Sequence, residues 1–174
     1  IFGQHHGCFV KAFGDLFRET KALRVIFLSS TSYNVEDLLH NFYQLVHLRY
    51  LRIGGSSRYR TRFPNKLSRF YHVMVLHAHH YAYINVLPRD MSNLGKLRHF
   101  HVEDDSTHSS IVEVGKLKSL QELRRFVVKQ EDKGFELREI GHLVHLCGSL
   151  SIYNLENVRV KEEVDEAKLL QKSR

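Results

Sequence analysis

The sequence has few of the residues that mark small disulfide-bonded proteins or membrane-spanning proteins. Among 174 residues there are two cysteines, two prolines and no tryptophan. Two isolated cysteines, Cys8 and Cys147, cannot build a disulfide scaffold, and no apolar run approaches the ~20 residues of a membrane-spanning helix. No signal peptide is recognisable after Ile1. We therefore expect neither a membrane span nor a disulfide-stapled secreted domain.

The sequence does contain ample apolar surface. Hydrophobic residues make up 43% of the chain, and charged residues make up 26%. This composition is typical of a folded chain, because a disordered one has too little apolar surface to offset the entropy of ordering. From its first and last residues we expect the chain to be a segment of a longer protein.

An apolar pattern recurs along most of the chain. In each occurrence, two apolar residues three positions apart are followed by a third apolar residue two positions later, and further apolar residues at three-residue spacing precede it. The central residues of the six occurrences are Ile26, Leu51, Leu76, Phe100, Phe126 and Leu150, at intervals of 25, 25, 24, 26 and 24 residues. The last occurrence contains one extra residue. A period of ~20–29 residues with this pattern is typical of leucine-rich repeats.

The repeat predicts an α/β fold of the leucine-rich-repeat solenoid type, an irregular horseshoe. We expect short parallel strands on its concave face and loops with short helices on its convex face, because each unit must stack on its neighbours to bury its apolar side. Residues 1–22 are interpreted as a lead-in helix or degenerate first repeat, 23–155 as about six repeats, and 156–174 as a helical segment leading into further repeats. A bundle of amphipathic helices is disfavoured, since helical phase would not reset at each repeat.

Strand residues between the inward apolar positions are expected to form a recognition face. The candidates are Phe27, Tyr50, Arg52, His77, His79, His99, His101, Arg125, Val127, Lys129 and Ser151. Neighbouring strands lie ~4.8 Å apart, so the four histidines can meet, and four imidazoles are able to hold Zn²⁺. A solvated, partly aromatic binding surface is the favoured interpretation, and no metal ligand is assigned.

Catalytic chemistry finds little support in the sequence. Glu103, Asp104 and Asp105 are adjacent carboxylates, a pattern that usually belongs to a solvated loop. No Ser-His-Asp or Cys-His arrangement has a recognisable context. The sequence therefore predicts a binding protein rather than an enzyme, with no cofactor bound by these residues.

Four stretches carry a resemblance to a known family. They are LVHLRYLRI (45–53), LPRDMSNLGKLRHFH (87–101), IVEVGKLKSLQELRRFVVK (111–129) and FELREIGHLVHLCGSLSIYNLENVRVKEEVDEA (135–167). Together they resemble plant disease-resistance proteins, more narrowly the coiled-coil type nucleotide-binding leucine-rich-repeat receptors of grasses. The resemblance covers roughly residues 20–174.

The resemblance implies a role in plant defence. The repeat domain would recognise a pathogen effector or a guarded host protein, and would restrain the nucleotide-binding domain of its own chain. No phosphate-binding loop of the form G-x-x-x-x-G-K-[ST] occurs here, so ADP or ATP binding is implied only for an upstream domain. The implied location is the cytoplasm, with the nucleus or the periphery of the plasma membrane as alternatives. The substrate-recognition arm of an F-box ubiquitin ligase is a second hypothesis.

The net charge of +7 lies entirely in the first half of the chain. Residues 1–87 contain 11 Lys and Arg against 4 Asp and Glu, whereas residues 88–174 contain 15 of each class. A candidate docking patch consists of Arg49, Arg58, Arg60, Arg62, Lys66 and Arg69. The resemblance places the nucleotide-binding domain near these repeats, which favours docking to an acidic surface there. Nucleic-acid binding through the cations and interleaved aromatics is the less favoured interpretation, and a plain solvated patch is a third.

Overall fold

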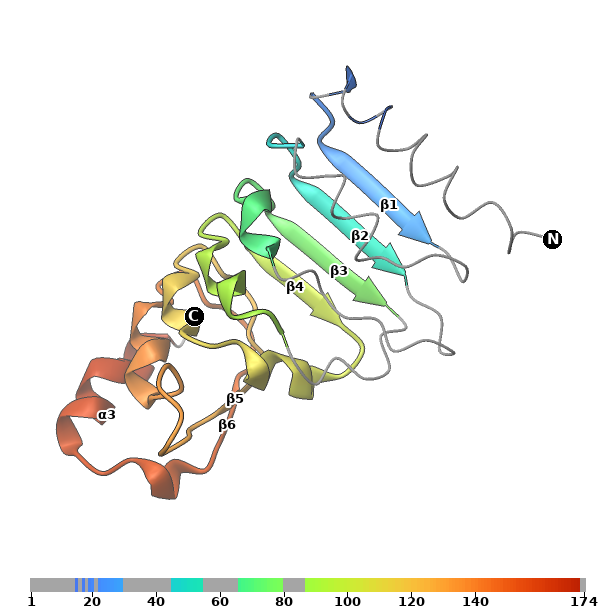
Figure 1. Ribbon diagram of the computed structural model, residues 1–174. Helices are drawn as coiled ribbons and strands as arrows, with labels where there is room; N and C mark the ends of the chain where they lie inside the picture. The colour runs from blue at the N-terminus through green and yellow to red at the C-terminus, as the bar shows by residue number, and fades with distance from the viewer. Residues whose placement is uncertain are drawn as a thin grey trace.

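The strands of the protein follow one another side by side in chain order (Figure 1). A computed structural model describes residues 15, 17, 19–20, 22–29, 45–54, 66–79 and 87–172. Within these ranges the strands are β1 (Val25–Ser29), β2 (Tyr50–Gly54), β3 (Val75–His79), β4 (His99–Val102), β5 (Arg125–Val127) and β6 (Ser151–Tyr153). The predicted short strand is therefore present in each of the six repeats.

All of the strand pairs in the described residues are parallel. β1 to β4 form one sheet in the order β1-β2-β3-β4, and β5 pairs with β6 in a second sheet. Ile26 lies opposite Leu51, and Leu51 lies opposite Leu76. Leu76 lies opposite Phe100. The central apolar residues of the first four repeats are thus aligned in one row across the sheet, which confirms the phase read from the sequence.

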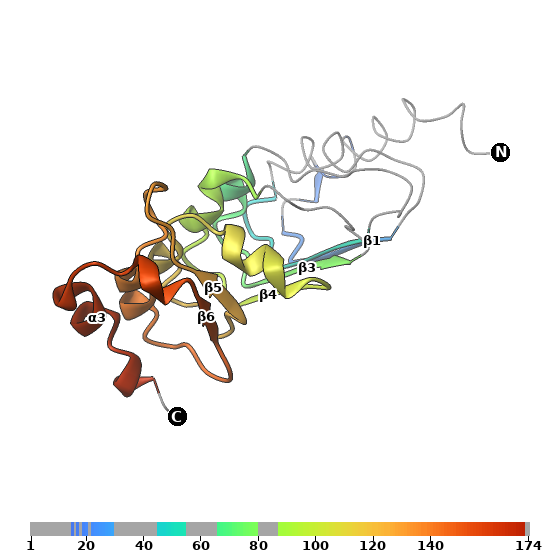
Figure 2. The same cartoon turned by 90° about the horizontal axis from the view of Figure 1, so that it is seen from below.

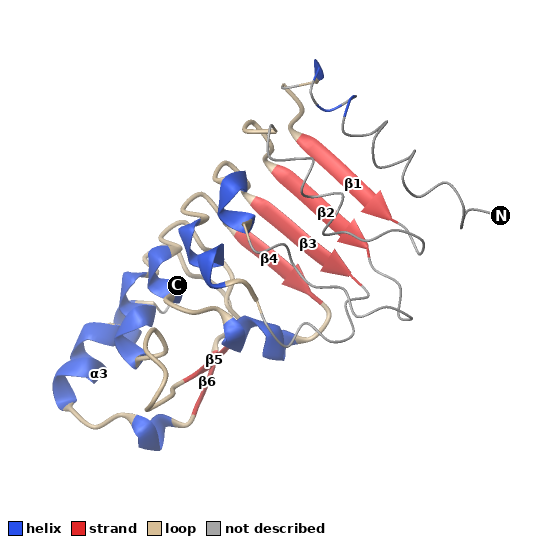
Figure 3. Ribbon diagram, viewed as in Figure 1, coloured by secondary structure: helices blue, strands red, loops and turns tan. Residues whose placement is uncertain are grey.

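The helices are short and lie beside the strands (Figure 3). They are the 3₁₀ helices η2 (Leu67–Phe70), η3 (Arg89–Asn93), η4 (Asp105–Ser110), η5 (Val114–Lys116), η6 (Leu137–His142), η7 (Leu155–Asn157) and η8 (Leu169–Gln171), and the α-helix α3 (Lys161–Ala167). Successive helices contact one another from η2 through η3, η5 and η6 to α3. In Figure 2 the sheet of β1 to β4 is seen close to edge-on, with the short helices η2 and η3 on one side of it.

The three-residue spacing before each strand has a direct backbone cause. The N–H of Leu94 donates to the carbonyl of Met91 at 3.0 Å, and the N–H of Leu97 donates to the carbonyl of Leu94 at 2.8 Å. Bonds from residue i to residue i−3 define 3₁₀ geometry, in which every third side chain points the same way. Apolar residues three positions apart therefore all face the strands and enter the core.

The core is one continuous layer of apolar side chains between the strands and the short helices. Leu48, Leu51, Ile53, Leu76, Leu94, Leu97, Leu117, Leu120, Ile140 and Leu143 are among its buried members. These are the inward residues that the repeat predicts. Because each unit contributes only a few of them, burial depends on the units above and below.

The first 22 residues lie almost entirely outside the described part of the chain. Phe17 is described and is buried in the core, and Leu23 packs against the core while partly buried. The predicted lead-in helix or degenerate repeat is otherwise not covered by the described residues.

The sixth repeat is in a different register from the one predicted. The sequence pattern places Leu150 at its centre, but Phe126 lies opposite Ile152. The pattern already allows one extra residue between Leu146 and Leu150, and the strand lies two residues further along the chain, so that the interval from Phe126 is 26 residues. The turn before the strand, in which Gly148 has a φ of 82°, contains these additional residues. Leu150 and Ile152 are both only partly buried, as expected where no seventh described strand covers the sheet.

Within the predicted helical segment, the described residues 156–172 form short helices separated by turns. α3 spans Lys161–Ala167 and stops where Lys168 takes a left-handed conformation with φ of 50°. Of the apolar residues at helical spacing only Ala167 is buried, whereas Val164 is 46% and Leu170 is 95% exposed. Close contact with η6 fixes the position of α3, because a Cβ at Gly141 would lie 2.0 Å from the carbonyl oxygen of Glu166.

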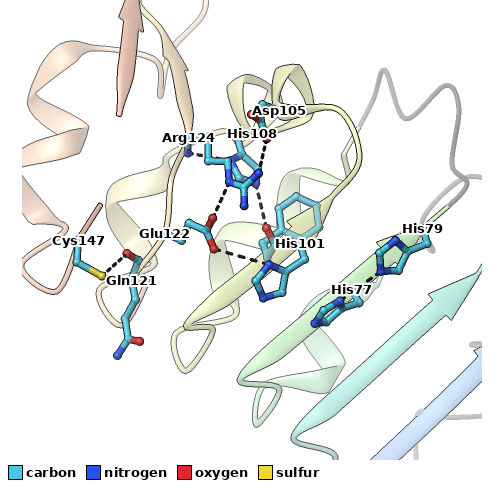
Figure 4. Close-up of polar contacts among 10 residues, drawn as sticks. His77, His79, His101, Asp105, His108, Gln121, Glu122, Arg124 and Cys147 are labelled. Carbon is cyan, nitrogen blue, oxygen red and sulfur yellow. Dashed lines mark hydrogen bonds and ion pairs between the residues drawn. The ribbon is translucent and has the colours of Figure 1, made fainter. Parts of the chain in front are cut away.

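A buried histidine spans the break between the two sheets. His108 lies in η4, and its Nε2 is 3.0 Å from the carbonyl oxygen of Phe100 in β4. The backbone N–H of Arg124, just before β5, donates to His108 Nδ1 at 2.9 Å (Figure 4). Since Nδ1 accepts, the proton of the neutral ring is on Nε2, which donates to Phe100. The imidazole thus connects a backbone carbonyl of β4 to a backbone N–H just before β5.

Replacing His108 should therefore destabilise the repeat array. In His108→Phe the ring volume is retained, but the two hydrogen bonds of the imidazole, to the Phe100 carbonyl and from the Arg124 N–H, are lost. We expect the free energy of unfolding to fall by about 1–3 kcal/mol, the cost of losing hydrogen bonds in a buried setting. Urea denaturation measures this. The matched control is His145→Phe at an exposed position, and equal stability of the two variants would contradict the bridging role.

Candidate functional site

The solvent-facing side of the strands carries the predicted recognition residues in two aligned rows. Phe27, Arg52, His77 and His101 lie opposite one another across β1 to β4, and Tyr50 and His99 lie in the adjacent row with Val25 and Val75. Alternate strand residues point to the same face, and the inward residues between them are buried. These residues form what we call the strand face.

Ring side chains contact one another across all four strands of the strand face. The ring centroids of Phe27 and Tyr50 are 5.1 Å apart, and those of Tyr50 and His77 are 5.4 Å apart. The ring of His77 lies 4.2 Å from that of His101. Phe27, at the start of this row, is 61% exposed. The result is a continuous ring surface, open to solvent, of a kind that protein interfaces favour.

The histidines of β3 and β4 form a polar cluster within the strand face (Figure 4). His77 Nδ1 and His79 Nε2 are 3.4 Å apart, and the other nitrogen of His79 lies 3.8 Å from a carboxylate oxygen of Glu103. The rings of His99 and His101 are stacked at 5.6 Å with an interplanar angle of 3°. The structure therefore brings together all four histidines that the sequence placed on this face.

Two residues that the sequence analysis missed complete the cluster. Glu122, which precedes β5, places Oε2 at 3.7 Å from His101 Nδ1. Its other oxygen accepts a hydrogen bond of 2.6 Å from Arg124 Nε, and Arg124 Nη1 lies 3.3 Å from Asp105. The position of Glu122 within the repeat could have been read from the sequence. It lies one residue before Leu123, the first apolar residue of the fifth repeat, just as Lys96 lies one residue before Leu97.

The electrostatics of the cluster favour neutral His77 and His101 beside an ionised Glu122. Burial, together with the smaller effects of His101, His79 and Arg52, lowers the pKa of His77 to about 4. Burial also lowers the pKa of His101, against the opposing effect of Glu122. Burial would raise the pKa of Glu122, but the hydrogen bond and charge of Arg124 outweigh it and the pKa is lowered. At neutral pH His77 and His101 thus present lone pairs beside the ionised carboxylate of Glu122.

The remaining residues predicted for recognition lie on the second sheet or just after β5. The Arg125 guanidinium stands 4.2 Å above the ring of Tyr153, and Lys129 Nζ lies 3.7 Å from the ring centre of Phe135. Val127 lies opposite Tyr153, and Ser151 lies opposite Arg125. Ser151 is therefore one row away from the position predicted for it, for the register reason given above, and Tyr153 takes that position.

The candidate docking patch is only partly within the described residues. Arg49 is exposed just before β2, Lys66 is exposed just before η2, and Arg69 is exposed within η2. Arg58, Arg60 and Arg62 lie outside the described ranges. The structure thus places the described members on the segment before a strand and on a helix, and not in the rows of the strand face.

Comparison with known protein families identifies the same kind of repeat. A family description of a leucine-rich repeat region matches residues 8–171. The chain belongs to this leucine-rich repeat family. Such a region indicates a role in protein–protein interaction. No curated protein matches the chain. In the part of the leucine-rich repeat chain that the structure describes, no helix has the length and apolarity needed to cross a bilayer.

The lowered histidine pKa values predict acid sensitivity of this leucine-rich repeat region. His77, His101 and His108 all have a pKa below the usual 6.5 in the folded state. From pH 6.5 down to about 4 the unfolded chain therefore binds more protons than the folded chain, and the free energy of unfolding falls as the pH falls. Urea denaturation at a series of pH values in this window measures the slope.

Removing one of the shifted groups should flatten that slope. We expect His77→Gln to lose less stability on acidification than the unsubstituted chain, while His145→Gln at an exposed position keeps the original slope. A stability that is constant or increases on acidification from pH 6.5 would contradict the prediction.

Proposed function

We propose that this leucine-rich repeat region recognises a protein partner through the strand face. The observation that carries the proposal is the ring surface from Phe27 across Tyr50 and His77 to His101. Exposed aromatic side chains next to an arginine, here Arg52, are the composition of interface hot spots. The proposed role is binding without catalysis, and it requires no cofactor on this chain.

The parent protein is proposed to be an intracellular plant immune receptor of the coiled-coil nucleotide-binding type. The resemblance of residues 45–53, 87–101, 111–129 and 135–167 to such receptors supports this, and the match to a leucine-rich repeat region agrees with it. The partner would then be a pathogen effector or a guarded host protein. The nucleotide switch, with its ADP or ATP, would lie in a domain outside the 174 residues, and the receptor would act in the cytoplasm.

The repeats are further proposed to belong to an irregular horseshoe-shaped solenoid, with the strand face on its concave side. Strand pairing in chain order supports this arrangement. Beyond β6, Leu155, Val160 and Leu170 are more than half exposed. Such apolar side chains would be covered by a further repeat stacked on this end.

The docking patch is proposed to restrain the switch. Its cations would face an acidic surface of the nucleotide-binding domain in the same receptor. Contacts of this kind contribute orientation and rate more than affinity. The charge asymmetry between residues 1–87 and 88–174 supports this placement.

Charge reversal on the strand face tests recognition. In the full receptor expressed in leaves, Arg52→Glu should abolish the cell-death response to the pathogen that the receptor detects, because it places a carboxylate within the ring surface. The matched control is Lys118→Glu, which reverses the charge at an exposed position outside the strands. A full response by Arg52→Glu, at equal receptor accumulation, would show that recognition lies elsewhere.

Charge reversal in the docking patch tests restraint. The triple variant Arg58→Glu, Arg60→Glu and Arg62→Glu should cause cell death without any pathogen, because like charges would separate the repeats from the switch. Cell death is scored by ion leakage in leaves that express equal amounts of receptor. If the triple variant stays silent while it is well expressed, the restraint role of this patch is wrong.

A further inference from the structure

Within the described residues, one group of side chains has the composition and spacing of a metal site. His99, His101 and Glu122 each offer a ligand atom, and these atoms all lie within 4.8 Å of one another. Ligands of a tetrahedral zinc ion are about 3.3 Å apart when the Zn–N distance is ~2.0–2.1 Å. Side-chain movements of at most about 1.5 Å would therefore close the group around an ion. Movements of that size are available to half-buried side chains at a surface.

The backbone positions the three ligands from two neighbouring repeats. His99 and His101 are alternate residues of β4, so both rings stand on the same side of the strand, and their planes are within 3° of parallel. Glu122 comes from the next repeat, where the N–H of Gln121 donates to the carbonyl of Arg98 at 2.9 Å. That backbone bond fixes the segment bearing the carboxylate beside β4.

The carboxylate is already oriented for coordination. Arg124 Nε holds Glu122 Oε1 at 2.6 Å, which leaves Oε2 directed at His101 (Figure 4). Arg124 is itself held by Asp105, at 3.3 Å from Nη1. Metal-binding carboxylates are commonly fixed in this way by a hydrogen bond to the oxygen that does not bind the ion. An ion at Oε2 would leave the Arg124 bond in place.

We infer that His99, His101 and Glu122 bind a divalent transition-metal ion, with zinc as the best match. Two imidazoles and one carboxylate form a three-ligand set that zinc accepts with a fourth position open, and imidazole favours zinc, copper and nickel over magnesium and calcium. His99 and Glu122 also line a hollow of about 510 Å³, together with Cys147. Water or a side chain of a bound protein would complete the coordination at the open position.

Two of the three ligands, His101 and Glu122, have pKa values shifted toward the protonation states that metal binding needs. Histidine must be neutral and glutamate ionised to coordinate. The pKa of His101 is lowered chiefly by burial, and that of Glu122 is lowered by Arg124 in spite of burial. His77 stands 4.2 Å from His101, ring to ring, and is neutral as well, with its pKa lowered to about 4 chiefly by burial. It therefore adds no repulsion to an incoming cation.

Zinc titration of the 174-residue chain tests the inference. Isothermal titration calorimetry with zinc chloride at neutral pH should show one site per chain. Glu122→Gln, which keeps the shape of the side chain, and His101→Ala should each weaken zinc binding by more than about 100-fold, beyond the ~10–100-fold typical for an outer-shell partner. Long-range proton–nitrogen NMR spectra of the imidazoles should show the largest zinc-induced changes at two of the thirteen histidines.

Exposed residues elsewhere in the chain provide the control variants. His145→Ala and Glu156→Gln, both at exposed positions, should change zinc affinity by less than about twofold. The inference is overturned if no binding heat is seen, if the control variants weaken binding as much as the ligand variants, or if zinc perturbs the histidines indiscriminately. The NMR readout needs no substitution, so a variant that fails to fold leaves the test decisive. A negative result would leave protein recognition by the ring surface untouched.

Discussion

The inward side chains of one repeat, such as Leu51 and Ile53, are covered by those of the repeats on either side. No unit contains enough apolar surface to close a core of its own, so every other feature depends on stacking in register. The 3₁₀ turns before each strand serve this requirement, because they direct every third side chain at the strands. The strand face is the opposite side of the same layer, and its rows are aligned because the core is aligned.

Strand pairing is interrupted between β4 and β5, although the apolar core continues past this point. At the interruption His108 bonds to the Phe100 carbonyl of β4 and accepts from the N–H of Arg124. An imidazole suits this place because a single neutral ring both donates and accepts at opposite sides. Its lowered pKa, caused mainly by burial, keeps the ring in that state at neutral pH. The hydrogen bonds of His108 connect the two sheets, and because they require a neutral ring, this connection depends on pH.

The sequence predicted the regular features and missed the exceptions for identifiable reasons. Leu97 and Leu120 were placed correctly because their spacing repeats in every unit, and parallel pairing followed from stacking. The register of Ile152 was missed because a shift of two residues keeps the same side chains facing inward, so the alternation of apolar residues does not distinguish Leu150 from Ile152 as the centre of the strand.

The histidine cluster, like the fold, was predictable where it follows the repeat pattern and not where it departs from it. His77, His79, His99 and His101 lie on strands whose phase was known, so their meeting could be expected. Glu122 lies in the turn before β5, where the side-chain direction depends on local hydrogen bonds with Arg124. His108 lies outside the repeating apolar pattern, and its burial depends on the interruption between β4 and β5, which is visible only in three dimensions.

The length of the repeats shows how packing of the core determines which side chains lie on the surface. The interval from Leu76 to Phe100 is one residue shorter than the interval from Leu51 to Leu76, yet both pairs lie in register. The loops must therefore absorb the difference, since a one-residue slip in a strand would turn His99 and His101 inward and expose Phe100. The cost of burying two imidazoles in place of apolar residues opposes that slip. Packing of the core thus fixes which side chains lie on the strand face, and differences in repeat length are accommodated in the loops.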